Sequence, residues 1–355
     1  MKKNILLALI ASLLVTSHDG NCSVAHKTRN AQKYAQLGSN NQIVGIGTAE
    51  MSYRSGLNAM EAQDWKSAFR HFEALQRYHV GSEFVPDSYY YAGVSLFQVR
   101  DYDVANKYFN LYLKEQNNPK FFEEAIKYKF SIAELLRGGE PRRPFGPSGL
   151  PRFLPAGDTA VTIYDEVIAA VPSHELAAQS LFYKGCLLWK QHHYRDSVDA
   201  FYMLARRFPK HELTPQAYLN VAKLYHDQSN YEYQNPDIIS LAEINLKKFS
   251  EEFPREEKLA EAEKEVIKVR EVYARGLYET AQFYERTYKT KASLIYYETA
   301  IRQFPGTETE KKCRSRLSSL APAILRNIDE ALQAEAIELQ DFDVLDGINF
   351  EDFVP

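Results

Sequence analysis

The sequence predicts an all-α fold in which about five to six pairs of antiparallel helices stack into a solenoid. Three observations predict this fold. Small and aromatic residues recur 37 positions apart, since Gly56, Trp65, Ala68 and Phe72 return as Gly93, Tyr102, Ala105 and Phe109. A third copy of the pattern is Gly185, Tyr194, Ser197 and Phe201. Prolines follow at regular intervals, and a period of this length indicates stacked helical repeats rather than a compact enzyme domain.

The spacing is that of the tetratricopeptide repeat, a helix pair of about 34 residues that stacks into a right-handed superhelix. The glycine lets the first helix approach the second closely, and the aromatic residue one turn after the second small residue fills the core. Proline then ends the second helix. These terminators are Pro119, Pro172, Pro209, Pro254 and Pro305. Further signatures of second helices are Ala160–Tyr164, Ala242–Leu246 and Ala292–Tyr296.

We expect the repeats to occupy residues 51–320, interrupted by a Pro/Gly-rich insertion at 138–157 that cannot be helical. Arg142 and Arg143 give this insertion a cationic character, and it is either solvated or a loop that contacts a partner. Residues 321–340 predict a capping helix with a polar outer face. Residues 341–355 alternate acidic and apolar side chains, which predicts an acidic disordered tail that is either solvated or docks on a partner.

The amino-terminal segment predicts export. Lys2 and Lys3 precede an apolar run from Ile5 to Val15, which is too short to span a bilayer but fits a signal peptide over residues 1–25. The polar residues 26–50 read as a flexible tether. Cys22 is a candidate for lipidation, although Asp19-Gly20-Asn21 is a poor lipobox and cleavage before His26 is the alternative.

The composition favours a binding protein over an enzyme. The formal net charge is −4, and no basic stripe accompanies the tyrosines, so we expect no nucleic-acid partner. The sequence has no Gly-rich phosphate loop, nucleophile elbow, CxxC or HExxH motif, and we therefore predict no catalytic residue, cofactor or metal. A hydrolase with a repeat appendage is disfavoured because the repeats leave no room for a catalytic domain.

The closing repeat is more specific than a generic tetratricopeptide repeat. The segment VREVYARGLYETAQFYERTYKTKASLIYYETAIRQFPGTETEKKCRSRL (269–317) has an Arg-rich helix end, an aromatic pair, a short turn and a helix that ends in QFPGTE. It resembles the BamD/YfiO family of outer-membrane assembly lipoproteins. The preceding FSEEFPREEKLAEAEKEV (249–266) is similar to the penultimate repeat of that family. The resemblance covers residues 181–317, and the family often has glutamate where this chain has Leu277.

The resemblance implies a periplasmic scaffold at the inner face of the outer membrane, attached by a lipid or through its partners. The implied partners are the Omp85-type barrel insertase, other assembly-complex lipoproteins and unfolded outer-membrane protein segments. By position, Arg275, Tyr278, Tyr284 and Tyr288 would lie near the insertase contact. The first two repeats, around Asn58, Gln63 and Tyr90, would meet clients. A periplasmic tetratricopeptide adaptor for cell division or for envelope polymer export or secretion is the alternative function, and the poor lipobox favours it.

Overall fold

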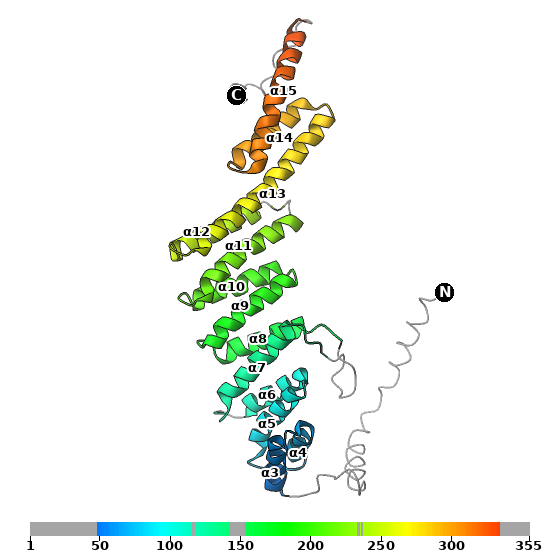
Figure 1. Cartoon of the computed structure of the whole chain (residues 1–355), viewed down its shortest axis with the longest axis vertical. Coiled ribbons are helices and arrows are strands. Elements are labelled where there is room, and N and C mark those ends of the chain that lie inside the picture. The colour runs from blue at the N-terminus through cyan, green and yellow to red at the C-terminus, as the bar shows by residue number, and fades with distance from the viewer. Residues whose placement is uncertain (1–47, 116–117, 143–152, 233–234, 236, 334–355) are drawn as a thin grey trace, which may run out of the picture. The chain divides into compact units, whose positions relative to one another are not determined.

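The computed structural model of the chain describes residues 48–115, 118–142, 153–232, 235 and 237–333. The chain divides into two compact units, Met1–Ala125 and Ile126–Pro355, and each is described by itself. Every regular element among the described residues is an α-helix (Figure 1), apart from one isolated β-bridge between Arg142 and Leu154. The predicted all-α architecture is confirmed.

The first unit contains two complete helix pairs. These are α3 (Ala49–Glu61) with α4 (Trp65–Tyr78), and α5 (Val85–Gln98) with α6 (Tyr102–Glu115). Consecutive helices pack together throughout, from α3 on α4 to α5 on α6. Asp64 begins α4, because its carboxylate accepts a hydrogen bond of 3.1 Å from the backbone N–H of Ser67.

The second unit contains most of α7 and the remaining helices. They are α7 (Phe122–Arg137), α8 (Gly157–Ala170), α9 (Glu175–Lys190), α10 (Tyr194–Arg207), α11 (Leu213–Tyr231), α12 (Asp237–Glu252), α13 (Lys258–Arg286), α14 (Thr290–Gln303) and α15 (Glu308–Gln333). The first helices of successive pairs also contact one another. Helix α9 contacts α11, and α11 contacts α13. The described helices thus form six pairs and a final helix, in agreement with the predicted five to six pairs.

In three of the repeats, the glycine and the phenylalanine meet at the crossing of the two helices. A Cβ atom on Gly56 would lie 2.6 Å from the Phe72 ring, and one on Gly93 would lie 2.8 Å from the Phe109 ring. In the second unit, a Cβ atom on Gly185 would lie 2.8 Å from Phe201. These distances are shorter than van der Waals contact, so only glycine fits opposite the buried phenylalanine. The physical reason given for the repeat pattern is therefore confirmed.

The other predicted core residues follow the same layout with two exceptions. Ala68, Ala105, Tyr102 and Ser197 are buried, whereas Trp65 and Tyr194, which begin the second helices, are half-buried. The pattern in the last pair was placed one residue too early. Ser293 and Tyr297, rather than Ala292 and Tyr296, are the buried small and aromatic residues of α14. Both registers put an aromatic residue four positions after a small one, so the spacing alone does not separate them.

In four of the pairs, the turn between the two helices has the same backbone conformation. Gln63, Arg100, His192 and Tyr288 all adopt a left-handed conformation, with φ between 58° and 61°. In the last pair, Tyr288 N–H donates to Glu285 O and Lys289 N–H to Tyr284 O, the two hydrogen bonds of a Schellman motif. Glycine is the usual residue at this position, so four non-glycine residues there each carry a conformational cost.

Two linking segments differ in part from expectation. Helix α7 ends at Arg137 and α8 begins at Gly157, close to the predicted insertion 138–157, and the Arg142–Leu154 bridge brings its two ends together. The predicted capping helix does not begin at residue 321, because α15 runs unbroken from Glu308 to Gln333 with Pro322 inside it.

Several predictions fall on residues outside the described ranges. These are the signal peptide, Cys22, most of the tether, Arg143, residues 334–340 and the acidic tail.

Two further findings bear on chemistry and location. None of the helices in the described ranges is long and apolar enough to cross a membrane. Cys186 and Cys313 are free thiols, and burial raises the pKa of Cys186 to about 11 and that of Cys313 to about 12. Thiolates are the reactive form, so both cysteines are inert packing residues.

Candidate protein-interaction surface

The last helix pair carries an exposed aromatic surface. Phe283, near the end of α13, is 53% exposed, and Tyr288, in the turn before α14, is 93% exposed. Between them, Tyr284 stacks on Tyr296 of α14 with 5.3 Å between ring centroids and 12° between ring planes. The Lys289 ammonium lies 5.9 Å from the centre of the Tyr284 ring. We call Phe283, Tyr284, Tyr288, Lys289 and Tyr296 the tip cluster.

Helix geometry explains why the cluster faces solvent. Ala281 is fully buried and occupies the position opposite Tyr297 that Gly185 occupies opposite Phe201. Successive helix residues point about 100° apart, so Phe283, two positions after Ala281, points away from the core. The left-handed conformation of Tyr288 ends α13 and projects its side chain from the turn. Exposed tyrosine and phenylalanine side chains held on rigid helices are typical of protein-binding sites.

The predicted contact residues are only partly brought together. Tyr284 and Tyr288 belong to the tip cluster, and Arg275 is exposed three helical turns earlier on α13. Tyr278 instead packs against the last core cluster, with its ring centroid 5.7 Å from that of Tyr297. Arg142 is exposed at the edge of the insertion, in the same unit but on another element.

Tyr90, which the resemblance places in a client groove, is buried. It is 8% exposed and stacks on Phe121 with 4.5 Å between ring centroids. Tyr90 is therefore a core residue of the first unit and offers no surface to a client. Asn58 and Gln63 remain accessible, since both are exposed, Gln63 in the turn and Asn58 on α3.

The sequence reasoning missed Phe283, Lys289 and Tyr296. Their exposure depends on the register of α13 and α14. A signal was present, because Ala281 precedes Tyr297 by the same interval that separates Gly185 from Phe201. That alignment would have assigned Tyr297 to the core and left Tyr296 and Phe283 on the surface.

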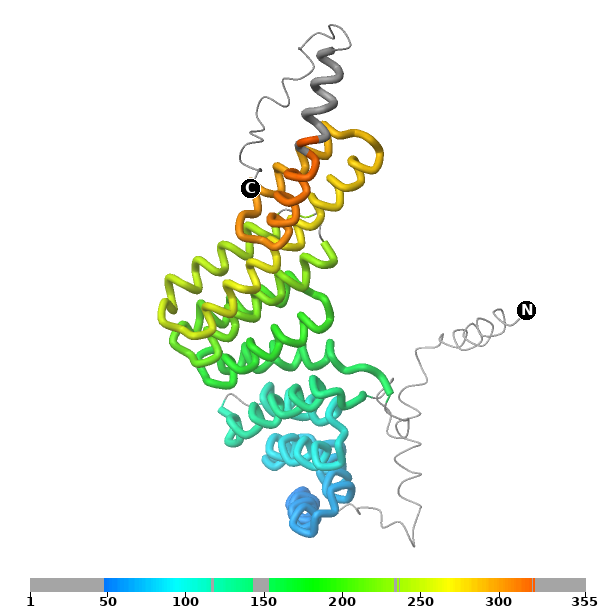
Figure 2. The backbone as a smooth tube through the Cα atoms, turned by 45° about the horizontal axis from the view of Figure 1, so that its top comes forward, coloured from blue at the N-terminus to red at the C-terminus, as the bar shows by residue number. Residues whose placement is uncertain are grey.

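Helix α15 fixes the hairpin that carries the tip cluster. Arg316 on α15 forms a bidentate ion pair with Glu285 on α13, and one of its bonds, from Nε to Oε2, measures 3.1 Å. The Tyr297 hydroxyl of α14 donates to the same carboxylate at 3.0 Å. Glu271 of α13 accepts the backbone N–H of Thr309 at 3.1 Å and so caps the start of α15. Figure 2 shows α14 and α15 beside the carboxyl-terminal part of α13.

This ion pair gives the hairpin a pH dependence. The hydrogen bond from Arg316 holds the pKa of Glu285 below its ordinary value of 4.5. A lowered folded-state pKa contributes stability above the unfolded pKa, and that contribution is lost as the pH falls through the folded pKa. Because both side chains are partly exposed, we expect Glu285→Gln to lower the free energy of unfolding by only about 1 kcal/mol at pH 7. Urea unfolding of both proteins at pH 7 and pH 3 should show a smaller difference at pH 3 than at pH 7. A difference of equal size at both pH values would contradict the assignment.

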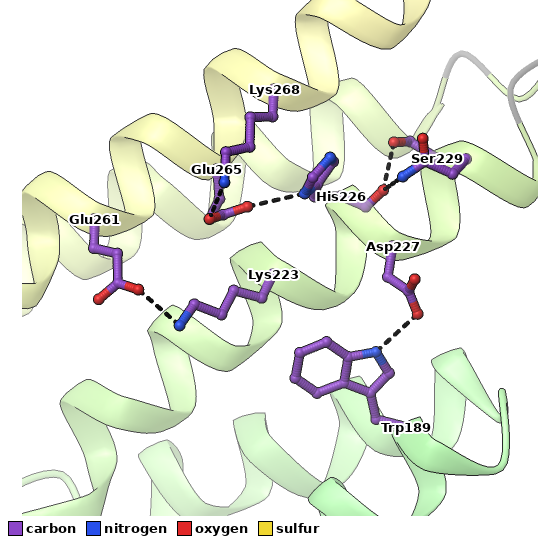
Figure 3. A network of polar contacts seen from close by, with 9 residues as sticks. Trp189, Lys223, His226, Asp227, Ser229, Glu261, Glu265 and Lys268 are labelled. Atoms are coloured by element: carbon purple, nitrogen blue, oxygen red, sulfur yellow. Dashed lines mark hydrogen bonds and ion pairs between the residues drawn. The ribbon is translucent and has the colours of Figure 1, made fainter.

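A polar network joins the first helices of neighbouring pairs in the second unit (Figure 3). Lys223 on α11 pairs with Glu261 on α13 at 2.7 Å. One turn further along, Glu265 is 7% exposed and contacts His226 Nδ1 at 2.9 Å and Lys268 Nζ at 2.8 Å. These pairs satisfy the charges between α11 and α13, so this face rigidifies the stack rather than presenting unpaired charge.

A second part of the same face combines polar and aromatic groups. Asp227 on α11 accepts hydrogen bonds from Trp189 Nε1 at 3.1 Å and from the Tyr194 hydroxyl at 3.2 Å. His192 contacts the Tyr194 hydroxyl at 2.9 Å, and Tyr231 packs beside both rings. His192 is thus tied into an aromatic cluster. In the described ranges, no group of His, Cys, Asp and Glu side chains is arranged to hold a metal ion.

An apolar groove lies among α8, α9 and α10. It encloses about 250 Å³, and Ile168, Leu181 and Leu188 form part of its wall. Asp196 and Asp199 also line it, and Lys184 pairs with Asp165 at its edge at 2.6 Å. A groove with an apolar wall and several carboxylates suits a protein segment better than a small anionic ligand.

Comparison with known proteins defines the class of the chain. Residues 53–120 match the model of the tetratricopeptide repeat family, and this range contains the first two copies of the sequence pattern. Together with the helix pairs described above, the match shows a tetratricopeptide-repeat protein, a class that works as a scaffold for protein–protein interactions. No curated protein sequence matches the chain, and the resemblance to the BamD/YfiO family stays a prediction.

Several solved structures are similar in fold only. MamA 41-end from Desulfovibrio magneticus RS-1 is 15% identical, with 62% of this chain and 98% of that chain covered and a TM-score of 0.31. A tetratricopeptide repeat protein from Parabacteroides merdae ATCC 43184 is 13% identical, with 75% and 96% covered and a TM-score of 0.33. The TPR repeats protein BF2334 from Bacteroides fragilis NCTC 9343 is 13% identical, with 69% and 96% covered and a TM-score of 0.37. Similarities at this level say nothing of function.

Proposed function

We propose that the chain is a non-enzymatic scaffold of the outer-membrane β-barrel assembly machinery, located in the periplasm at the inner face of the outer membrane. The tip cluster binds the Omp85-type insertase, and grooves between repeats bind client barrel segments. One observation carries the proposal: the exposed aromatic surface lies on the helix pair whose sequence, 269–317, resembles the BamD/YfiO family.

The chemistry of the tip cluster supports a protein partner. Tyrosine is enriched among the residues that dominate binding energies, and a large aromatic side chain loses little conformational entropy when it docks. Phe283 and Tyr288 offer apolar area, while Lys289 supplies charge beside the Tyr284 ring. The ion pair from Glu285 to Arg316 holds the hairpin rigid, which reduces the ordering cost of association.

The predicted export signal supports the location. The apolar segment Ile5–Val15 after Lys2 and Lys3 would direct the chain out of the cytoplasm. Lipidation of Cys22 would hold the scaffold at the membrane, and contact with the insertase would do so if the signal is cut elsewhere. The alternative function, a periplasmic adaptor for cell division or for polymer export or secretion, keeps the same fold and location but takes different partners.

Affinity purification from gently solubilised envelopes tests the proposal. The tagged chain should recover an Omp85-type barrel in near-stoichiometric amount, as identified by mass spectrometry. The double variant Phe283→Ser/Tyr288→Ser should reduce this recovery at least about tenfold, the loss expected when two aromatic contact residues are removed.

A matched variant separates a local effect from a general one. Tyr78 is 55% exposed and Val80 is 75% exposed, and both lie in the first unit, so Tyr78→Ser/Val80→Ser should leave the recovery unchanged. Recovery of division or export proteins without the barrel would overturn the assembly role and favour the adaptor.

A further inference from the structure

The tip cluster is flanked by positive charge. Arg286 and Lys289 are exposed on either side of Tyr288, and neither forms an ion pair with any residue that the structure describes. Glu285, the acidic residue nearest to Tyr288 along the sequence, is engaged by Arg316. The surface therefore combines apolar area with cationic groups, and it suits a segment that alternates apolar and acidic residues.

Residues 334–355 have that composition. They contain no Lys, Arg or His. The acidic residues are Glu335, Glu338, Asp341, Asp343, Asp346, Glu351 and Asp352, and the large apolar residues include Phe342, Leu345, Ile348, Phe350 and Phe353. Charge and apolar character thus both match the tip cluster.

The segment begins within reach of the tip cluster. Arg316 of α15 contacts Glu285, three residues before Tyr288, and α15 ends at Gln333. The helix from Arg316 to Gln333 extends about 26 Å at roughly 1.5 Å per residue. Residues 334–355 extend up to about 70 Å at roughly 3.3 Å per residue. The segment is therefore long enough to return along α15 to the tip.

We propose that residues 334–355 bind the tip cluster of the same chain and cover it when no partner is present. Phenylalanines of the segment pack against Phe283 and Tyr288, and its carboxylates pair with Arg286 and Lys289. Tethering gives the segment a high effective concentration, so weak contacts suffice to occupy the surface. A partner must displace the segment, which makes the tip available only to ligands that bind it more tightly. This inference uses the same surface as the proposed function but does not require the insertase. An experiment can therefore contradict one without contradicting the other.

Peptide binding by two forms of the chain tests the inference. A fluorescent peptide of residues 334–355 is titrated with residues 26–333 and with residues 26–355, and anisotropy is measured. The shorter form keeps every described helix and should bind the peptide. The longer form should bind at least about tenfold more weakly, because its own segment occupies the site. Raising the salt from about 0.05 M to about 0.5 M should weaken binding, since screening reduces the ionic contacts.

Surface variants of the shorter form locate the site. Arg286→Glu/Lys289→Glu and Phe283→Ser/Tyr288→Ser should each weaken peptide binding at least about tenfold, as loss of a main contact does. Tyr78→Ser/Val80→Ser should not change it. The inference is overturned if the shorter form does not bind the peptide, if both forms bind it equally, if the tip variants bind normally, or if a scrambled peptide binds as well. Circular dichroism of each variant confirms that it is folded.

Discussion

Replacing Phe201 by alanine should lower the free energy of unfolding by about 3–5 kcal/mol. Phe201 is 1% exposed and lies in a core cluster of the second unit, with Leu181, Leu204 and Val221. Removing its ring leaves a cavity at the crossing of α9 and α10, where the glycine opposite provides no side chain to fill it. Urea unfolding followed by circular dichroism measures the loss.

The glycine opposite makes this prediction specific to the repeat geometry. A Cβ atom on Gly185 would lie 2.8 Å from the Phe201 ring, so Gly185→Ala alone should cost about 1–3 kcal/mol through overpacking. In the Phe201→Ala background, the same change meets no ring and should cost little or be favourable. Phe283→Ala is the matched control, because that ring is 53% exposed. Strictly additive effects of the two core changes would show that Gly185 and Phe201 do not meet as described.

Replacing Glu166 by glutamine should lower the free energy of unfolding by a similar amount, about 3–5 kcal/mol. Lys129 on α7 is 1% exposed, and its ammonium contacts the Glu166 carboxylate on α8 at 2.5 Å. Without that carboxylate, the Lys129 ammonium stays buried and loses its ionic partner, and glutamine offers only a weaker neutral hydrogen bond. This pair matters because it joins α7 and α8 across the insertion.

The pH dependence distinguishes this mechanism from simple loss of packing. Burial lowers the pKa of Lys129 from its ordinary 10.5, and Glu166 opposes that shift. A lysine with a lowered folded-state pKa binds its proton more weakly in the folded protein, so stability rises with pH up to the unfolded value. Glu166→Gln removes the opposing effect, and its deficit should shrink as the pH rises from 7 toward 10. Lys129→Met/Glu166→Gln serves as the control, since it buries no charge and should be less destabilised. A deficit independent of pH would contradict the account.

The repeat pattern was readable in the sequence because steric rules fix it. Gly56, Gly93 and Gly185 each face a phenylalanine 16 positions later, and every such pair meets in the structure. The bounds of the insertion were also predictable, since proline and glycine exclude helix there. The length of helix α13 was not predictable. The segments 249–266 and 269–317 were assigned to separate repeats, whereas α13 contains parts of both. Nothing between Val266 and Val269 interrupts a helix, and α13 continues through both.

The candidate surface was only half predictable. A resemblance indicated Tyr284 and Tyr288, but the sequence does not tell an exposed tyrosine from a packed one. Tyr278 and Tyr284 lie on the same helix, yet one packs on Tyr297 and the other stacks at the surface on Tyr296. Tyr90 was misplaced for the same reason. Which of two neighbouring tyrosines is buried depends on how one helix is rotated against the next. A shift of one residue moves a side chain from the core to the surface.

The most direct test of the scaffold role is the affinity between purified components. The chain beginning at His26 is titrated into the isolated periplasmic domains of the Omp85-type insertase encoded by the same genome, and the heat of binding is measured. The account predicts saturable binding with one site, weakened at least about tenfold by Phe283→Ser/Tyr288→Ser and unchanged by Tyr78→Ser/Val80→Ser. No binding, or binding that the tip variant leaves intact, would contradict it.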